Sequence, residues 1–262
     1  MMMNWCDPSD NSRLIISPRG YVSFRGVGES STIAERLVMF ETGAAIPHII
    51  EKYSPEEYPF KFPGFLSNHP VYALAGKSNI SLVQGGYGAP AAVCALEAAI
   101  ALGCKYFFVF GTCGGIHQDL KVGDLVIPTE VVREEGTSFH YLPDQSNAFP
   151  DENLLVELDN YLRSTDRTGI HVGKTVSTDA PFRQTLNKEL RWRSEGILSV
   201  DMETSALLTV ARYYRIPAVS LHIVSDAHDL EGDRPWTWGD QDFKAKRLKA
   251  IDDFIEFVRN VS

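Results

Sequence analysis

Short apolar runs alternate along the chain with longer segments whose apolar residues recur at helical spacing. The runs have the length and the branched or aromatic content of buried strands. They are residues 71–76, 80–84, 106–110, 124–132, 170–176 and 218–224. Strands that alternate with helical segments are typical of a sheet covered by helices on both faces. The pattern therefore predicts an α/β fold with a mixed central sheet.

Helical patterns fill much of the chain between and after these runs. Residues 89–103 are rich in alanine and leucine and end at Gly103, which can terminate a helix. Asp151 and Asp201 each precede a segment with an apolar stripe, where an N-cap is expected. A closing helix carries its apolar stripe over residues 243–258. No repeat or linker-like stretch appears, so we expect a single domain over residues 1–262.

The longest segment without such patterning is residues 227–241. It is rich in turn-forming residues but also contains Trp236 and Trp238. A loop of this length without regular structure is often a lid or a contact surface.

Composition and charge narrow the classes of function. The chain has 262 residues, 44% of them hydrophobic, which is enough for a full core, and a formal net charge of −9. A negative charge argues against nucleic acid or an anionic membrane as partner and leaves small metabolites. No secretory signal or apolar run of roughly 18 residues is present, so we expect a soluble, cytoplasmic protein. The four cysteines lack the spacing of a zinc site or disulfide framework, and no metal site is expected.

The segment QGGYGAP (84–90) places glycines, Gly86 among them, between a predicted strand and a predicted helix. Such a loop lets backbone amides approach an anion. A dinucleotide site would also need an acidic residue at the end of the next strand, which here ends in Gly111 and Thr112. Two neighbouring strands that end in small residues instead predict a crevice for a phosphate or sugar, the alternative being tight packing without a ligand.

Glu203 opens the helical segment that follows Asp201. Its spacing from Leu207 and Val210 puts its carboxylate on the core-facing side, where the helix N-terminus would keep it ionised. It can accept hydrogen bonds from a pair of sugar hydroxyls, or merely complement the helix dipole. Met202 beside it is either core packing or an apolar wall for a ribose.

Asp226 follows a buried strand, at the end where ligands gather in open α/β sheets. Partial burial would raise the pKa of Asp226 and allow it to protonate a leaving group. The alternative is an Asp that starts a turn by bonding its own backbone. His222, within that strand, is interpreted as a packed core histidine. Residues 130–144 form either a pocket wall or a hydrated loop.

Four separated motifs give the chain a resemblance to a known family. VQGGYGAPAA, FGTCGGIHQDLKVGDLVIPTEVVREEGTSFHYLP, STDAPF and SVDMETSALLTVARYYRIPAVSLHIVSD follow in this order over roughly residues 80–226. This resembles the nucleoside phosphorylase family of purine nucleoside and uridine phosphorylases, and residues 12–40 resemble the uridine branch. The resemblance implies a single α/β domain around a twisted, partly barrel-like mixed sheet, in a homodimer or homohexamer. It also implies phosphorolysis of a nucleoside to free base and ribose 1-phosphate without a cofactor.

The resemblance assigns roles to individual residues of this chain. Thr112 would contact phosphate and ribose, with Gly86 also at the phosphate. Met202 would pack on the sugar and Glu203 would bind its hydroxyls. The base would lie along Cys113 and Gly114, covered by Phe182 or its neighbour Pro181.

The resemblance also favours a purine as the base. Purine-specific members carry a Ser-Asp pair after the last strand, and the Asp protonates the purine ring. Ser225 and Asp226 form that pair here. The Gln-x-Arg pair that reads uracil in uridine phosphorylases has only a poor substitute in residues 183–185, although GTSFHYLP is similar to the uridine branch.

The two arginines that grip phosphate in the family are absent. Ala45 and Val109 stand near their places, and Glu41 stands near a family glycine. Losing two guanidinium groups removes bidentate, charge-assisted hydrogen bonds, on the order of several kcal/mol. A charged Glu41 would add repulsion.

Three explanations remain open for this departure. Other cations can hold phosphate, with Arg25, Arg133 and Lys61 as candidates. Water can replace phosphate in a nucleosidase, with Glu41 as the general base. Catalysis can also be lost, which would leave a nucleoside-binding protein.

Overall fold

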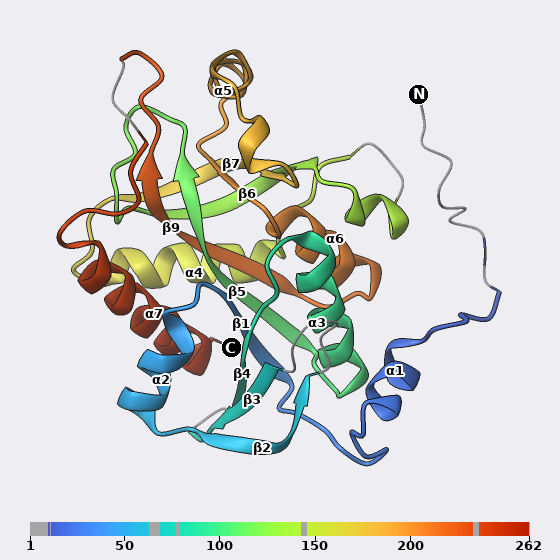
Figure 1. Cartoon of the computed structure of the whole chain (residues 1–262). Coiled ribbons are helices and arrows are strands. Elements are labelled where there is room, and N and C mark those ends of the chain that lie inside the picture. Colours follow the sequence, from blue (N-terminus) through green and yellow to red (C-terminus); the bar gives the residue numbers. More distant parts are fainter. Residues whose placement is uncertain are drawn as a thin grey trace.

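The computed structural model describes residues 10, 12–62, 69–76, 79–142, 146–232 and 236–261. Within these residues nine strands form one mixed sheet in the order β2-β3-β4-β1-β5-β8-β7-β6-β9 (Figure 1). The strands are β1 (Arg36–Glu41), β2 (Glu56–Phe62), β3 (His69–Leu74), β4 (Ile80–Gln84), β5 (Tyr106–Gly115), β6 (Leu125–Glu134), β7 (Ile170–Thr178), β8 (Ser199–Asp201) and β9 (Ala218–Ala227).

Part of this sheet closes on itself. β9 pairs antiparallel with β6 at the end of the strand order and also pairs in parallel with β5. The strands β5, β8, β7, β6 and β9 therefore form a closed ring, while β1 to β4 extend from β5 as an open wing. The expected α/β fold with a mixed, partly barrel-like sheet is confirmed.

Helices cover the sheet on both faces, as Figure 1 shows. The longer helices are α2 (Ala45–Tyr53), α3 (Ala89–Ala101), α4 (Glu152–Ser164), α5 (Leu186–Ser194), α6 (Thr204–Tyr213) and α7 (Phe243–Asn260). Shorter ones are α1 (Pro18–Phe24), η1 (Thr137–His140) and η2 (Pro181–Arg183). Among the described residues, no helix is both long and apolar enough to cross a bilayer.

The two faces of the wing are set by strand alternation. In β1, Leu37 and Met39 pack into a cluster with residues of α3 and α6, whereas Val38 and Phe40 pack into a second cluster with α2, α4 and α7. Side chains of a strand point alternately to opposite faces, so both faces of β1 are apolar. The four central residues of β1 are thereby buried, and its last residue, Glu41, lies at the edge of the sheet.

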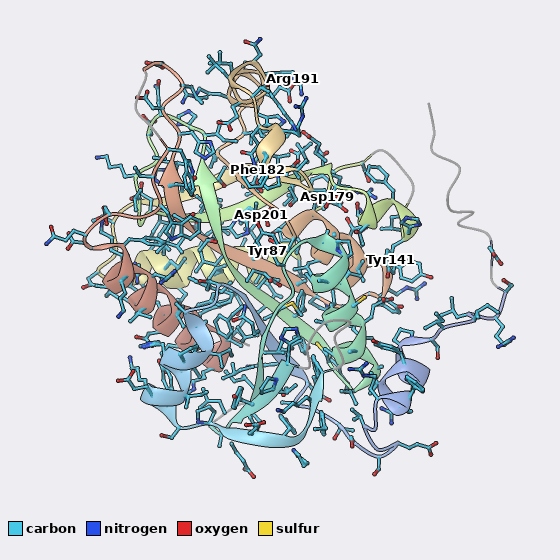
Figure 2. The ribbon with its side chains drawn as sticks, in the orientation of Figure 1. Tyr87, Tyr141, Asp179, Phe182, Arg191 and Asp201 are labelled. Atoms are coloured by element: carbon cyan, nitrogen blue, oxygen red, sulfur yellow. The ribbon has the colours of Figure 1, made fainter. Side chains whose placement is uncertain are left out.

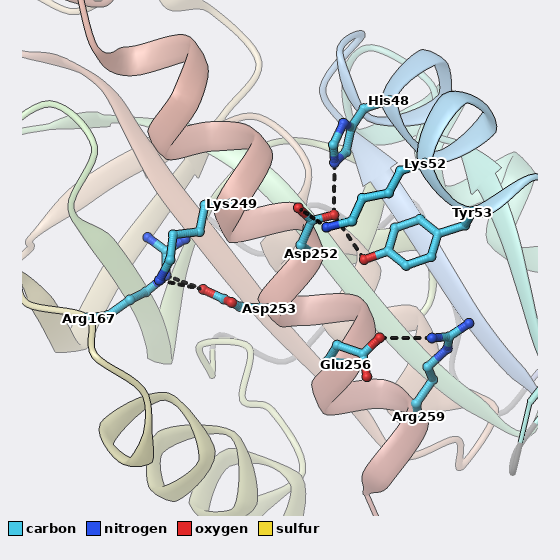
Figure 3. A network of polar contacts seen from close by, with 9 residues as sticks. All are labelled: His48, Lys52, Tyr53, Arg167, Lys249, Asp252, Asp253, Glu256 and Arg259. Carbon is cyan, nitrogen blue, oxygen red and sulfur yellow. Dashed lines mark hydrogen bonds and ion pairs between the residues drawn. The ribbon is translucent and has the colours of Figure 1, made fainter.

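A polar network fixes α2 against α7 (Figure 3). Asp252 of α7 accepts hydrogen bonds from Tyr53 at 2.9 Å and contacts His48 at 2.8 Å, and it pairs with Lys52 at 2.8 Å. All three partners lie on α2, which begins directly after the turn that follows β1. The network therefore joins α2 to the closing helix α7.

Several predicted elements differ from those in the structure. The strand predicted to end at 110 continues to Gly115, because residues 111–115 pair with β9 and Gly114 and Gly115 also pair with β8. The helix predicted over 89–103 ends at Ala101, and Gly103 has φ +106, a conformation that suits glycine. β1, β2, β8, α2 and α5 were not predicted from the apolar pattern.

Candidate active site

The register of the sheet brings several strand ends to one edge. β1 pairs in parallel with β4 and with β5, and β5 pairs in parallel with β9. The carboxyl ends of these four strands therefore meet at one edge of the sheet. Glu41 lies opposite Gly111, and Gly114 lies between Val200 of β8 and Asp226 of β9. Two strand spacings separate β8 from β9, about 10 Å. This edge is the candidate active site.

Asp201 and the chain that follows it build the wall on the β8 side. The Asp201 carboxylate accepts hydrogen bonds from the amides of Glu203 and Thr204 and from the hydroxyl of Ser177. Asp201 ends β8, and the N-cap position of α6 is Glu203, so the predicted N-cap is displaced by two residues, although Asp201 does bond the amides at the start of the helix. Glu203 is itself buried, and its Oε1 accepts a hydrogen bond from the amide of Gly88 at 2.7 Å. The hydrogen bonds to Asp201 and Gly88 therefore fix Glu203 between the end of β8 and the loop that follows β4.

The glycine-rich loop (84–90) packs tightly against α3 and also places a backbone amide at Glu203. A Cβ on Gly86 would lie 2.5 Å from the Cβ of Ala91, so this glycine is needed for tight packing against the start of α3. Gly88 has φ +85, and its amide binds the Glu203 carboxylate of this chain. One of the loop amides that were expected to approach a ligand's anion is therefore already hydrogen-bonded to a carboxylate of the same chain. Tyr87 between them is exposed (Figure 2).

Glu203 titrates differently from the expectation that a helix N-terminus would keep it ionised. Burial, and then repulsion from Asp201, raise the pKa of Glu203 to about 8, although the Gly88 hydrogen bond opposes this. Asp179 acts in the same direction as Asp201. The dipole effect is worth less than the cost of placing a second carboxylate beside Asp201 out of water.

Glu41 places a third carboxyl group at this edge. A Cβ on Gly85 would lie 1.8 Å from Glu41 Oε1, so the carboxyl group lies against the end of β4. Oε1 is buried without a hydrogen-bond partner in the described chain, although part of the residue is accessible. Burial, followed by repulsion from Glu203 and Asp201, raises the pKa of Glu41 well above its ordinary value. A neutral Glu41 offers a hydrogen-bond donor to a ligand.

Asp226 is held in a hydrogen-bonded cage at the opposite wall. Its Oδ1 accepts from the Ser225 hydroxyl at 2.6 Å, and its Oδ2 contacts His228 Nε2 at 2.8 Å and Trp236 Nε1 at 2.7 Å. Burial acts to raise the pKa of Asp226, but these hydrogen bonds outweigh burial and lower it. The expected raised pKa is wrong, because the partners of Asp226 stabilise its ionised form.

His228 was not among the predicted site residues. Its Nδ1 lies 2.6 Å from Oε2 of Glu189, a buried carboxylate on α5. Burial acts to lower the pKa of His228, but the hydrogen bonds to Asp226 and Glu189 raise it to about 9. His228 follows Asp226 by only two residues, but no motif in the sequence linked it to Glu189.

The remaining predicted residues are arranged unevenly about the edge. Gly114 lies close to Asp226, because a Cβ built on Gly114 would lie 3.3 Å from Asp226 Oδ2. Thr112, on β5, pairs with Ile223 of β9. The thiol of Cys113 is buried in an apolar cluster with Leu120, Val126 and Val224. Burial raises the pKa of that thiol.

Met202 and Phe182 lie at the accessible side of the edge. Met202 is half-buried beside Glu203. Phe182 is fully exposed on η2, and it appears in the same part of Figure 2 as Asp179 and Asp201. In the single chain, Phe182 therefore covers nothing.

None of the three alternative cations reaches the edge within the chain. Arg25 ends α1, a helix whose Arg19 bonds the Ala101 carbonyl at the far end of α3 from Gly88. Lys61 lies on β2, the outermost strand of the wing. Arg133 is buried, bonds Ser138 and the carbonyls of residues 142 and 146, and stacks on a phenylalanine ring.

Residues 130–142 are an ordered wall rather than a hydrated loop. Glu135 is buried and accepts hydrogen bonds from Ser138 and from the Ser205 hydroxyl of α6 at 2.9 Å. Residues 143–145 of the predicted segment lie outside the described residues. The two places of the missing arginines are apolar core: Ala45 and Val109 are both buried.

His222 is a packed core histidine, as predicted. It is buried on β9, with Nε2 at 2.8 Å from Thr204 Oγ1 and 3.0 Å from Ser220 Oγ. Within the described chain, no cluster of histidine, cysteine and carboxylate residues suits a metal ion. Cys94, Cys104 and Cys113 are free thiols, and Cys6 lies outside the described residues.

A separate cavity of about 500 Å³ lies away from this edge. Its walls include Phe149, Arg212, Arg215 and Ala218, at the amino ends of α4 and β9. Asp226 is at the opposite end of β9. None of the predicted site residues lines this cavity.

Comparisons with known proteins agree with the resemblance. A family model described as the phosphorylase superfamily matches residues 35–261. A guanosine phosphorylase of Halorubrum lacusprofundi is 29% identical over 190 residues, covering 72% of this chain and 78% of that protein. A DeoD-type purine nucleoside phosphorylase of Brevibacillus brevis is 34% identical over 58% of this chain and 65% of its own length.

Two uridine phosphorylases complete the comparison. The one from Salmonella typhimurium is 30% identical over 52% of this chain and 59% of its own length. The match thus spans less than two thirds of this relative and of the Brevibacillus one. A crystal structure of uridine phosphorylase from Vibrio fischeri, complexed with 6-hydroxy-1-naphthoic acid, superposes with a TM-score of 0.68 at 21% identity and covers 89% of both chains.

Proposed function

Because the chain belongs to the phosphorylase superfamily, we propose that it cleaves the N-glycosidic bond of a purine nucleoside with phosphate. The products are the free base and ribose 1-phosphate, and no organic cofactor or metal takes part. The observation that carries the proposal is the register of β5, in which Gly114 pairs with Val200 of β8, three residues before Glu203, and with Asp226 of β9. A nucleoside can span that edge, with its ribose on Glu203 and its base beside Asp226.

Each end of the nucleoside has a chemical role in this proposal. Glu203 accepts hydrogen bonds from the ribose hydroxyls, with Met202 against the sugar, and steadies the ribose as it gains oxocarbenium character. The electron pair of the C1′–N9 bond passes to the purine, which takes a proton on its ring from the Asp226 side. Thr112 contacts phosphate and ribose, and the base lies along the backbone of Cys113 and Gly114.

A purine is favoured over uridine because of the acid at the base end. In the proposed binding mode, Asp226, with its partners Ser225, His228 and Trp236, lies beside the purine ring nitrogen that takes the proton. The uracil-reading Gln-x-Arg pair is replaced by residues 183–185, of which Arg183 ends η2. The guanosine and purine nucleoside phosphorylases among the relatives support the same choice.

Phosphate must be held here without the family's arginines. The raised pKa of Glu41 favours its protonated form, which can donate a hydrogen bond to a phosphate oxygen instead of repelling it. Gly86 and Thr112 line the same edge. A second copy of the chain, in a homodimer or homohexamer, could bring Arg25 to the phosphate and cover the base with Phe182, which is fully exposed in one chain.

Hydrolysis is the second candidate, and a specific observation favours it. Glu41, Asp201 and Glu203 lie close together, and each of these groups that is ionised raises the cost of binding a dianion beside it. Water is neutral and avoids this cost. In its ionised form, Glu41 would be the general base for that water.

Product analysis with and without phosphate separates these candidates. The protein is incubated with inosine, guanosine, adenosine, methylthioadenosine and uridine, and sugar products are identified. We expect phosphate-dependent ribose 1-phosphate from a purine nucleoside, and slower or no reaction with uridine. Free ribose at the same rate without phosphate would replace phosphorolysis by hydrolysis. Binding of nucleoside without turnover under either condition would contradict both.

A further inference from the structure

We propose that His228, held in place by Glu189, supplies through Asp226 the proton that the departing purine takes. The inference rests on the proposed function and adds two residues to it. His228 is a proton donor that acts through Asp226, and Glu189 is a positioning residue that acts through His228.

The hydrogen bonds around Asp226 leave it without a proton of its own in the resting protein. Ser225 Oγ donates to one carboxylate oxygen, and His228 Nε2 and Trp236 Nε1 lie within hydrogen-bond distance of the other. A carboxylate that accepts several hydrogen bonds is stabilised in its ionised form. The proton needed by the purine must therefore come from a neighbour, and His228 is the neighbour that titrates.

Glu189 and Gly114 hold the imidazole in one orientation. Glu189 Oε2 lies 2.6 Å from Nδ1, so Nε2 points to Asp226 at 2.8 Å. Glu189 is only 5% exposed, and a buried carboxylate stabilises an imidazolium strongly. A Cβ on Gly114 would lie 2.7 Å from Nε2, so glycine on β5 lets the ring approach the strand. Glu189, His228 and Asp226 thus form a hydrogen-bonded chain from α5 to β9.

The charges that face His228 favour a proton on it at neutral pH. They are Glu189 from α5 and Asp226 from β9, and the residue that faces it from β5 is Gly114, which carries no charge. Burial acts against the charged ring, but the two carboxylates outweigh burial and raise the pKa of His228 to about 9. The donor is therefore loaded before substrate binds.

The proton transfers balance as follows. His228 gives its Nε2 proton to the Asp226 carboxylate, and the resulting carboxylic acid gives a proton to the purine ring as the C1′–N9 electron pair enters the base. Asp226 ends as a carboxylate, as it began. His228 ends neutral, with its Nδ1 proton still donated to Glu189, and it regains a proton from water after the base leaves.

A substrate whose base needs no proton tests the relay. In 7-methylguanosine the methyl group already makes the purine a neutral leaving group, whereas inosine requires protonation. We expect His228→Gln to lower kcat on inosine by about 10²-fold or more, as for loss of a general acid. The kcat of this variant on 7-methylguanosine should stay within about threefold of the unaltered protein, because that base needs no proton. KM for both nucleosides should also stay within about threefold, a change of less than about 1 kcal/mol.

His48→Gln is the matched control. His48 also contacts an aspartate, Asp252, through Nε2 at 2.8 Å, and its side chain is 15% exposed against 13% for His228 (Figure 3). It lies on α2, outside the site, so its replacement should leave both reactions unchanged. Glu189→Gln is the second variant and should lower kcat on inosine but not on 7-methylguanosine.

Each result supports or overturns the relay. Selective loss on inosine in the two site variants supports it. Equal loss on both nucleosides would assign His228 a structural role only, and full activity on inosine would remove it from the proton path. If the unaltered protein cleaves neither nucleoside, the proposed function itself is overturned and the relay with it.

Discussion

Asp226→Asn should slow cleavage of inosine by about 10²- to 10⁴-fold, the range for removal of a positioned proton-transfer group. Asparagine keeps the shape of the side chain and can still accept from Ser225, but it cannot pass a proton to the purine. The loss should fall on kcat, because the side chain acts on the leaving base during bond cleavage. Steady-state kinetics with inosine measure it, and circular dichroism checks that the variant is folded.

Asp252→Asn provides the control for this variant. Asp252 also has three hydrogen-bonding or ion-pair partners, but it lies between α2 and α7 (Figure 3). We expect its replacement to leave kcat on inosine near that of the unaltered protein. If Asp226→Asn retained kcat within about threefold, a change of less than about 1 kcal/mol, Asp226 would have no part in proton transfer.

Glu203→Gln should weaken nucleoside binding by about ten- to a hundredfold, since a hydrogen bond to a charged group is worth about 1.5–3 kcal/mol. Glu203 Oε1 is already occupied by the Gly88 amide at 2.7 Å. A glutamine that keeps its oxygen on that amide turns its NH₂ group towards the ribose and loses an acceptor. Calorimetric titration with inosine in phosphate-free buffer at the alkaline end of the range, above the raised pKa of Glu203 where the carboxylate is formed, measures the change.

The same group predicts how binding depends on pH. Burial, and then Asp201, raise the pKa of Glu203 to about 8, so the carboxylate that accepts from hydroxyls forms as pH rises through that value. Affinity of the unaltered protein should therefore increase between pH 7 and 9, and Glu203→Gln should be nearly flat. Glu97→Gln is the control: Glu97 lies on α3 and accepts a hydrogen bond from Tyr214, and its replacement should leave the pH dependence of binding unchanged. Unchanged affinity in Glu203→Gln would exclude the ribose role.

The sequence predicted the elements that carry the site better than the chemistry within it. Asp151 was predicted as an N-cap and caps α4, because capping depends on residues only two and three positions ahead. The extension of β5 through residues 111–115 was missed, because glycines there are stabilised by partners on β8 and β9 that are distant in sequence.

The protonation of the carboxylates could not be predicted from local pattern. Burial alone suggested a raised pKa for Asp226, yet three hydrogen-bonding side chains lower it. Glu189, which completes the chain through His228, is 39 residues from it in sequence. Conversely, Glu203 is close to Asp201 and is not simply held ionised by its helix. These outcomes depend on which distant groups the sheet brings together.

The protonation of Glu41, at the proposed phosphate site, could not be predicted from the sequence either. The absence of two arginines was visible in the sequence, and repulsion by Glu41 was the expected consequence. The structure instead buries Oε1 of Glu41 against Gly85, near Glu203 and Asp201, and the raised pKa makes the group neutral. The proposed phosphate site therefore lacks the family's arginines, but its carboxyl group is not simply repulsive.

The most direct test of the account is a crystal structure of the protein with a purine nucleoside bound, in phosphate-free conditions. We predict that the ribose hydroxyls lie within hydrogen-bond distance of Glu203 and that a ring nitrogen of the base faces Asp226 across Gly114. A nucleoside bound elsewhere, for example in the cavity at the amino ends of α4 and β9, with neither carboxylate in contact, would contradict the account.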